Sequence, residues 1–372
     1  MEFRIHKEDF LNAINISQKA ISSRTTMEVI EGILIEAFDN NSIRLTSTDF
    51  EISIVTEENA EVIESGAAVI KGSLLGNIIR KLPSDTIEFK ADDKKVDIKC
   101  QNSFFSLSAF SKEDYPSLVE VKKENGVVFE KDFFLEAVKK SLVSVADNDS
   151  KPQFMGVLLD GDVNKLNFIA LDGYRISSSK IKKVLDRKVY SIIPSKALIE
   201  LSRILESSDD LSFNLYFDNN HILFDLEFTR FYTRLIDGKF IDYERILESN
   251  FKSSFTCDKK SLIDALERIS LITTSQNTRL IKININEKEL NITSNNEIGK
   301  GSEIVEIKEF KGEGINIAFN YRYLLDGLRV LSKDEVKVLF SGSNDPCLIV
   351  EDLEKIDFSY LVLPVRIKSE DF

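Results

Sequence analysis

The sequence lacks the residues on which many enzymes and metal sites depend. It has no tryptophan, only two histidines and only three cysteines among 372 residues. Cys100, Cys257 and Cys347 lie far apart, which excludes a disulfide framework and any CxxC metal or redox motif. His6 and His221 leave little material for histidine-based catalysis or a zinc site. We therefore expect no catalytic residues, no metal and no cofactor.

Long hydrophobic runs and familiar catalytic motifs are also missing. No apolar run approaches the ~18 residues that a membrane-spanning helix needs. The N-terminus lacks the basic start and apolar core of a signal peptide. The sequence therefore predicts a cytoplasmic protein with no membrane partner. The motifs GxxxxGK[ST], GxSxG, HExxH and DxDxDG do not occur. A hydrolase using dispersed carboxylates, such as those at 147–149, stays open as an alternative, although polar loop residues explain that stretch better.

What the chain does contain is a pattern of about 125 residues that occurs three times. The strings FLNA, FLEA and LIDA open three amphipathic segments and place alanines at 13, 137 and 265. A second amphipathic segment follows each opening and closes on a leucine at 82, 205 or 331. A strand-like segment then begins with phenylalanine at 105, 231 or 358. Three unrelated α+β domains would have to share this order and spacing by chance, so we predict three homologous repeats.

Each repeat combines two helices with several strands. Apolar residues at helical spacing predict helices over 7–22, 73–82, 131–146, 195–206, 258–271 and 320–333. Strands are predicted over 32–38 and 43–48, with turns at 39–41, 160–162 and 218–220. The expected fold class is α+β, with two helices packed on antiparallel sheets in each of three domains. The domains are predicted at 1–121, 127–248 and 252–372.

Negative charge dominates the chain, but not the predicted helices. The 49 Lys and Arg residues against 62 Asp and Glu residues give a net charge of −13, which argues against non-specific nucleic-acid binding. The six predicted helices hold 15 basic and 10 acidic residues, so they carry +5 and the rest carries −18. Side by side, such helices would form a weakly positive surface suited to holding duplex DNA loosely. Basic residues on solvated helix faces explain the same counts without DNA.

Five short strings occur in a fixed order along the chain. They are TDFE at 48–51, FSLS to DYPSL at 105–118, LDGYRI at 171–176, LIDGKFIDY at 235–243 and YLVLPVRI at 360–367. Together they resemble the bacterial sliding clamp family, the beta subunit of DNA polymerase III, over the whole chain. The resemblance implies the DNA clamp fold and a head-to-tail homodimer closed into a ring around duplex DNA, with no catalytic site. Such a ring tethers the replicative polymerase for processive synthesis.

The resemblance also implies three sets of site residues. The DNA contacts fall on Arg24, Arg80, Asn148, Lys196 and Arg203, to which helix-face reasoning adds Lys19, Lys81, Lys139 and Lys140. A pocket for short peptide motifs of the polymerase, the clamp loader and other DNA-processing proteins falls on Phe154, Leu171, Gly173, Arg175, Ile176, Ile241, Arg245, Ile246, Leu361, Leu363, Pro364, Val365, Arg366 and Ile367. The dimer interface would join Phe105 and Leu107 to Leu271 and Ile272.

The chain departs from the family pattern at several positions. Ser73 stands where a basic residue is usual, and Leu171, Tyr174 and Ile241 replace a usual Thr, His and Pro of the pocket. Residues 368–372 extend past the usual ending. This acidic segment ending in an aromatic could fold back into the pocket, whereas a disordered tail is the plainer interpretation. The acidic total and Ser73 also fit a three-repeat paralogue that binds peptides as a scaffold without encircling DNA.

Overall fold

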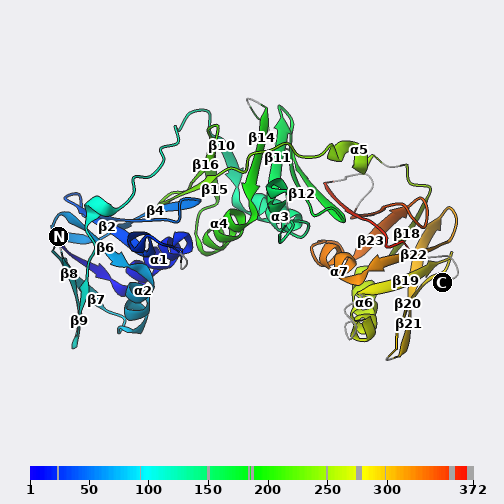
Figure 1. Cartoon of the computed structure of the whole chain (residues 1–372), viewed down its shortest axis with the longest axis horizontal. Coiled ribbons are helices and arrows are strands. Elements are labelled where there is room, and N and C mark those ends of the chain that lie inside the picture. The colour runs from blue at the N-terminus through cyan, green and yellow to red at the C-terminus, as the bar shows by residue number, and fades with distance from the viewer. Residues whose placement is uncertain are drawn as a thin grey trace. The chain divides into compact units, whose positions relative to one another are not determined.

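The computed structural model describes residues 1–22, 25–92, 94–148, 151–182, 185, 188–248, 250–273, 279–297, 299–351 and 357–366. The chain forms two compact units. One comprises Met1–Asp132 and Lys196–Leu235, and the other comprises Phe133–Ser195 and Ile236–Phe372. Figure 1 shows that sheets and short helices occur in both units. The second repeat contributes to both units, because the sheets continue across the repeat borders.

The first unit contains two antiparallel sheets. Their strand orders are β5-β1-β7-β8-β9 and β10-β15-β16-β17-β4-β3-β2-β6. The strands are β1 (Glu2–His6), β2 (Gly32–Phe38), β3 (Ser42–Thr48), β4 (Ile52–Asn59), β5 (Glu61–Glu64), β6 (Gly66–Lys71), β7 (Thr86–Ala91), β8 (Lys95–Cys100), β9 (Ser103–Ser108), β10 (Val127–Glu130), β15 (Ser212–Phe217), β16 (His221–Asp225) and β17 (Thr229–Arg234). The helices are α1 (Lys7–Ser17), α2 (Gly72–Lys81), most of α4 (Ser195–Ser207) and the short 3-10 turns η1 (Gln18–Ala20), η2 (Glu28–Glu31) and η3 (Lys112–Asp114).

Aromatic side chains fix α1 against the first sheet. The rings of Phe3 and Phe89 stack with centroids 4.7 Å apart, and Phe10 of α1 meets both rings edge-on at 5.8 Å. All three side chains are fully buried. Stacked and edge-to-face arrangements are the favourable aromatic geometries, so α1 has one preferred position on this sheet.

Strand β17 of the second repeat pairs with β4 of the first. Thr229 lies opposite Thr56, and Thr233 lies opposite Ile52. The hydroxyl groups of Thr56 and Thr229 are 3.0 Å apart and hydrogen-bonded. The eight-stranded sheet therefore runs from the first repeat into the second, and α4 is held in the same unit as α1 and α2.

The strands of the second unit form one twelve-stranded sheet. Its order is β14-β11-β12-β13-β25-β24-β23-β18-β21-β20-β19-β22. The strands are β11 (Gly156–Asp162), β12 (Lys165–Leu171), β13 (Arg175–Ile181), β14 (Val189–Pro194), β18 (Ser253–Asp258), β19 (Leu280–Ile285), β20 (Glu289–Asn295), β21 (Lys300–Lys311), β22 (Ile315–Asn320), β23 (Glu335–Phe340), β24 (Cys347–Val350) and β25 (Phe358–Val362). The helices are most of α3 (Lys131–Leu142), α5 (Tyr243–Leu247), α6 (Lys259–Thr273), α7 (Tyr321–Arg329) and the 3-10 turn η4 (Pro152–Met155).

Strand β25 of the third repeat pairs with β13 of the second. Ser177 lies opposite Tyr360, and Arg175 lies opposite Val362. This pairing places the segment after β25, residues 363–366, beside the beginning of β13. Two of the strings that carry the family resemblance, 171–176 and the described residues 360–366 of the last string, therefore meet at one place in the fold.

The predicted helices are all present, with ends that differ by a few residues. The strands at 32–38 and 43–48 and the turns at 39–41 and 218–220 are confirmed. The prediction of a turn at 160–162 was wrong, because these residues form the end of β11 and the turn lies at residues 163–164. Gly161 is needed there for close packing, since a Cβ atom would lie 2.7 Å from Leu166 Cδ1. No helix of the described residues is long and apolar enough to cross a membrane.

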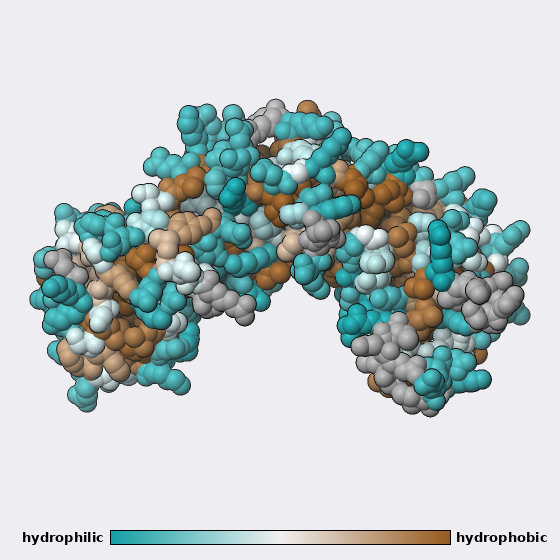
Figure 2. Space-filling view, in the orientation of Figure 1, coloured by the Kyte–Doolittle hydropathy of each residue, from teal (hydrophilic) through white to brown (hydrophobic). Residues whose placement is uncertain are grey.

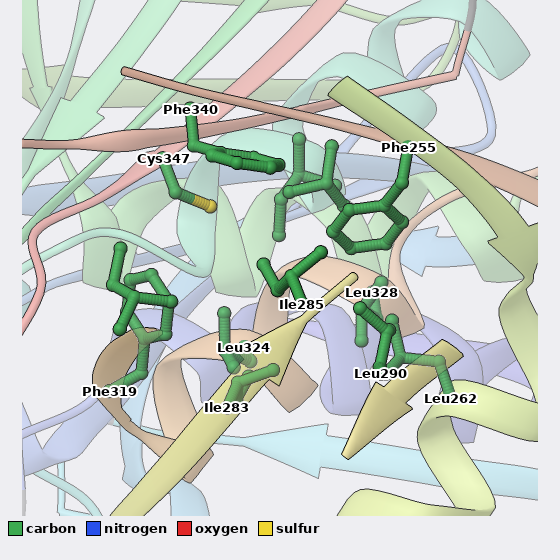
Figure 3. Close-up of a pocket in the computed structure, with 13 residues that line it drawn as sticks. Phe255, Leu262, Ile283, Ile285, Leu290, Phe319, Leu324, Leu328, Phe340 and Cys347 are labelled. Atoms are coloured by element: carbon green, nitrogen blue, oxygen red, sulfur yellow. The ribbon is translucent and has the colours of Figure 1, made fainter. Parts of the chain in front are cut away.

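The hydrophobic core of the third repeat encloses a cavity of about 30 Å³. Figure 3 shows the ring of Phe340 beside Cys347 at the upper left and the ring of Phe255 at the upper right, with Leu324 and Leu328 of α7 lower in the view. Every side chain that lines it is hydrophobic. Because a small apolar cavity offers water no hydrogen-bond partner, we regard it as part of the core and not as a ligand site.

Candidate functional site

The predicted DNA-contact residues of α2 are exposed and make no ion pair with any described residue. Arg80 donates from Nη1 to Asn77 Oδ1 at 3.2 Å and from Nη2 to Asn15 Oδ1 at 3.1 Å. Both acceptors are neutral amides, so they orient the guanidinium without cancelling its charge. Lys81 is exposed at the end of the same helix. Ser73, where the resemblance leads us to expect a basic residue, is exposed in the first turn.

The predicted cations of α4 and η1 already have carboxylate partners. Lys196 Nζ lies 2.6 Å from Asp49 Oδ2, and the Asp49 side chain is only 6% exposed. Glu200 lies 2.6 Å from Arg203 Nη1 and 3.6 Å from Lys19 Nζ. The positive charge expected on these helices is therefore partly neutralised within the first unit.

The two neighbouring lysines of α3 differ sharply. Lys139 is exposed, as expected for a DNA contact. The placement of Lys140 on the exposed face was wrong, because its side chain is only 7% exposed. Its Nζ lies 2.7 Å from Glu136 Oε1, 3.4 Å from Glu351 Oε2 and 5.4 Å from the ring centre of Phe358. Lys140 therefore joins α3 to the third repeat and is not available to phosphate.

Replacing Lys140 by methionine should destabilise the protein by about 1–3 kcal/mol, because the partly buried carboxylate of Glu351 loses its cation. Lys139→Met, a matched change on the next residue, should stay within about 0.5 kcal/mol of the wild type. Urea unfolding at neutral pH measures both. The hydrogen bond from Lys140 lowers the pKa of Glu136 below its ordinary value of 4.5. The stabilisation that this pair contributes is therefore fully present above pH 4.5, and it is lost as the pH falls through the lowered pKa. Equal stabilities of the two variants would contradict the assigned contact.

Of the two further predicted DNA contacts, Asn148 is exposed and Arg24 lies outside the described residues.

Six of the predicted pocket residues come together in one hydrophobic cluster of the second unit. They are the buried Phe154, Leu171, Ile176 and Leu361 and the partly buried Ile241 and Ile246. They come from η4, β12, β13, β25, α5 and the segment before α5, which are spread over about 200 residues of sequence. The fold thus brings together side chains that the sequence keeps far apart.

Apolar side chains remain exposed after β25. Leu363 is 38% exposed and Val365 is 39% exposed. The Leu363 N–H donates to the Tyr174 carbonyl, and the Val365 N–H donates to the Ala318 carbonyl, each at 2.8 Å. Figure 2 shows hydrophobic surface on the visible face beside the strands drawn in red in Figure 1. These backbone bonds hold Leu363, Pro364 and Val365 in an extended segment, which offers a surface for an aliphatic or aromatic anchor of a peptide.

Arg175 supports this surface and is not free at its rim. Its Nε lies 2.9 Å from Asp172 Oδ2 and its Nη1 lies 2.5 Å from Asp326 Oδ2. The guanidinium carbon is 4.6 Å from the ring centre of Tyr323. Burial disfavours the charged form, but Tyr360 and the two aspartates raise the pKa of Arg175 above its usual value. The residue therefore ties the start of β13 to α7.

Tyr174 and Tyr323 form an aromatic pair next to Arg175. Their rings are stacked with centroids 6.0 Å apart, and Tyr174 is exposed. Sequence reasoning missed Tyr323 and Asp326, because they lie in α7 about 150 residues from Arg175 and no local pattern links them. The remaining predicted pocket residues Gly173, Arg245 and Arg366 are exposed, and Ile367 and the tail at 368–372 lie outside the described residues.

Replacing Arg175 by methionine should destabilise the second unit by about 3 kcal/mol, because the largely buried Asp172 loses its paired cation. Arg245→Met, at an exposed position, serves as the control and should change stability by less than about 0.5 kcal/mol. Thermal unfolding with both variants in parallel measures the difference. An Arg175 variant as stable as the control would show that the network contributes nothing.

The predicted interface residues lie at a sheet edge and at a helix end. Phe105 and Leu107 belong to β9, which pairs with β8 and has no second partner among the described strands. Phe105 is exposed and Leu107 is partly buried. Leu271 is 77% exposed near the end of α6, and Ile272 is partly buried beside it. An open strand edge presents unpaired backbone N–H and C=O groups with which another chain can pair.

The cysteines offer no reactive group. All three are buried, and burial raises the pKa of the Cys257 and Cys347 thiols to about 12. Neither thiol is ionised to a useful extent at neutral pH. The described ranges contain no group of three or more His, Cys, Asp and Glu side chains that could hold a metal ion.

Comparison with known proteins gives matches along the whole chain. Residues 1–119, 129–242 and 244–366 match the N-terminal, central and C-terminal domains of the DNA polymerase III beta subunit. The beta sliding clamp of Staphylococcus epidermidis is 30% identical over 98% of this chain and 99% of that protein. The crystal structure of the sliding clamp of Bacillus subtilis superposes with a TM-score of 0.94 at 27% identity, over 99% of this chain and 100% of that chain. The beta subunit of Streptococcus pyogenes superposes with a TM-score of 0.94 at 26% identity and the same coverage.

Proposed function

The chain belongs to the family of the DNA polymerase III beta subunit, the bacterial sliding clamp, and we propose that two copies close head to tail into a ring around duplex DNA. It has the three-domain clamp fold. It is a processivity factor for DNA replication and not an enzyme. The observation that carries the proposal is the match of all three clamp domains, in order, over almost the full chain. A clamp that acts on bacterial DNA would lie in the cytoplasm.

The ring would hold DNA by its topology and by weak phosphate contacts. The exposed cations Arg80, Lys81 and Lys139 are the strongest candidates, since no described carboxylate is paired with them. Arg24 and Asn148 belong to the same predicted set, and Lys196, Arg203 and Lys19 are weaker candidates because carboxylates are already paired with them. Phosphate contacts carry no sequence information, so the ring would be free to slide.

Peptide motifs of the replicative polymerase and the clamp loader would dock on the surface formed by Leu363 and Val365. Six other residues of the same predicted set form a hydrophobic cluster, and two more, Arg245 and Arg366, are exposed. Short motifs with one or two hydrophobic anchors suit such a surface. Partner preference would reflect Tyr174 and Ile241, where this chain departs from the family.

The test is retention on circular DNA. The protein is loaded by the clamp loader of the same organism onto nicked circular DNA and washed with concentrated salt, which removes purely ionic binding. We expect the protein to remain on the circle and to be lost when the DNA is linearised. A paralogue acting only as a scaffold would bind the polymerase peptide but never be retained on the circle, and that result would overturn the proposal.

A further inference from the structure

Each repeat has an arginine two residues before its closing leucine, and these three arginines differ in their neighbours. In the first repeat, Arg80 is oriented by the neutral amides of Asn15 and Asn77. In the second repeat, Arg203 on α4 is paired with Glu200 at 2.6 Å. In the third repeat, Arg329 on α7 is paired with Glu267 on α6 at 2.7 Å. The first repeat alone places amides where the other two place a carboxylate.

Glu200 contacts two cations at once. Its Oε1 lies 2.6 Å from Arg203 Nη1, and its Oε2 lies 3.6 Å from Lys19 Nζ on η1. The Glu200 and Lys19 side chains are both largely shielded from solvent. Glu200 and Arg203 are one helical turn apart, and Lys19 reaches Glu200 from the neighbouring repeat. The carboxylate is therefore held by residues of two repeats within one compact unit.

We propose that Glu200 attenuates the grip of the ring on DNA by holding Lys19 and Arg203 away from phosphate. The proposal rests on the proposed function, because it concerns helices that DNA would pass. It leaves Arg80 and Lys81 as the principal phosphate contacts of the first unit. Glu200 acts through its two cations and is a positioning residue.

The physical reason lies in counterion release. A free lysine or arginine that meets a phosphate displaces a condensed cation, and this release drives most non-specific DNA binding. A cation paired with a carboxylate must first give up that partner, and the carboxylate itself repels the phosphate. Pairing therefore lowers both the affinity for DNA and its dependence on salt. A ring that is held by topology has no need of strong contacts, and weaker contacts favour sliding.

The experiment measures the binding of the full-length dimer to a short labelled duplex, which can enter the closed ring from its ends, over a series of salt concentrations. For Glu200→Gln we expect tighter binding, by at least about threefold at low salt, and a slope of log K against log salt steeper by about 0.9 for each cation released. Glu206→Gln is the matched control. It removes the same charge from the same helix, and Glu206 forms no ion pair with any described residue.

A double-mutant cycle adds a second readout. In the wild-type background, Arg203→Gln should change the slope little, whereas Arg80→Gln should reduce it by about 0.9. In the Glu200→Gln background, Arg203→Gln should also reduce it by about 0.9. Thermal unfolding of each variant shows whether the fold is intact.

The outcomes separate the two proposals. If the wild type is retained on circular DNA but Glu200→Gln and Glu206→Gln have the same slope, attenuation by Glu200 is wrong and the clamp function stands. If Arg203→Gln in the wild-type background reduces the slope as much as Arg80→Gln does, attenuation by Glu200 is also wrong. If the wild type is not retained at all, the proposed function itself has failed.

Discussion

Replacing Leu271 and Ile272 by alanine is expected to turn the dimer into a monomer. Leu271 is 77% exposed in the single chain, so in the predicted interface its side chain would gain most of its buried contacts from the partner. Truncating each side chain removes buried apolar surface that contributes about 2 kcal/mol to the free energy of association. A head-to-tail ring of two chains contains each contact twice. The total of about 8 kcal/mol weakens association by a factor of about a million. Analytical ultracentrifugation at micromolar concentration measures the change, and retention on circular DNA should be lost with it.

The controls separate the interface from general stability. Leu211→Ala removes a highly exposed leucine from the first unit, outside the predicted interface, and should leave the dimer intact. Phe105→Ala, on the opposite surface of the same predicted contact, should also give monomers. Ile272 lies against Gly301 of its own chain, so thermal unfolding must show that the double variant is folded. A folded double variant that stays dimeric would place the interface elsewhere.

Local pattern was sufficient for the helices, because amphipathic periodicity is a property of neighbouring residues. It failed at Gly161, where a glycine read as a turn is buried in a strand beneath Leu166. It could not find the pairing of β17 with β4 or of β13 with β25, since these partners lie more than 170 residues apart. Those two pairings decide which residues share a unit.

For the candidate site, too, one part was predictable and another was not. The resemblance predicted the residues that form the hydrophobic cluster around Phe154 and Leu361. It did not predict which charged side chains form ion pairs. Helix position alone could not show that Lys140 is buried against Glu351. The spacing of Glu200 and Arg203 was visible in the sequence as an i, i+3 pair, but Lys19 joins it only through the fold.

Leu363→Ala combined with Val365→Ala is expected to abolish binding of the polymerase peptide. A labelled peptide from the C-terminus of the replicative polymerase of the same organism should bind the wild type at micromolar concentration. Anchor contacts at the centre of such a surface contribute about 2 kcal/mol each, so losing both weakens binding about a thousandfold. A fluorescence titration of the peptide with each protein measures the effect.

This pair of substitutions is a sharper test than any change at Arg175. The Leu363 and Val365 side chains are exposed, and the hydrogen bonds of their segment come from the backbone, so alanine preserves the fold. Arg175 is tied to Asp172 and Asp326, and its loss would weaken both the fold and the surface. Val163→Ala, an exposed valine of the second unit in the turn between β11 and β12, should leave peptide affinity unchanged. If the double variant binds as tightly as the Val163 control, the peptide does not dock on this segment, and the partner surface must lie on other residues of the clamp.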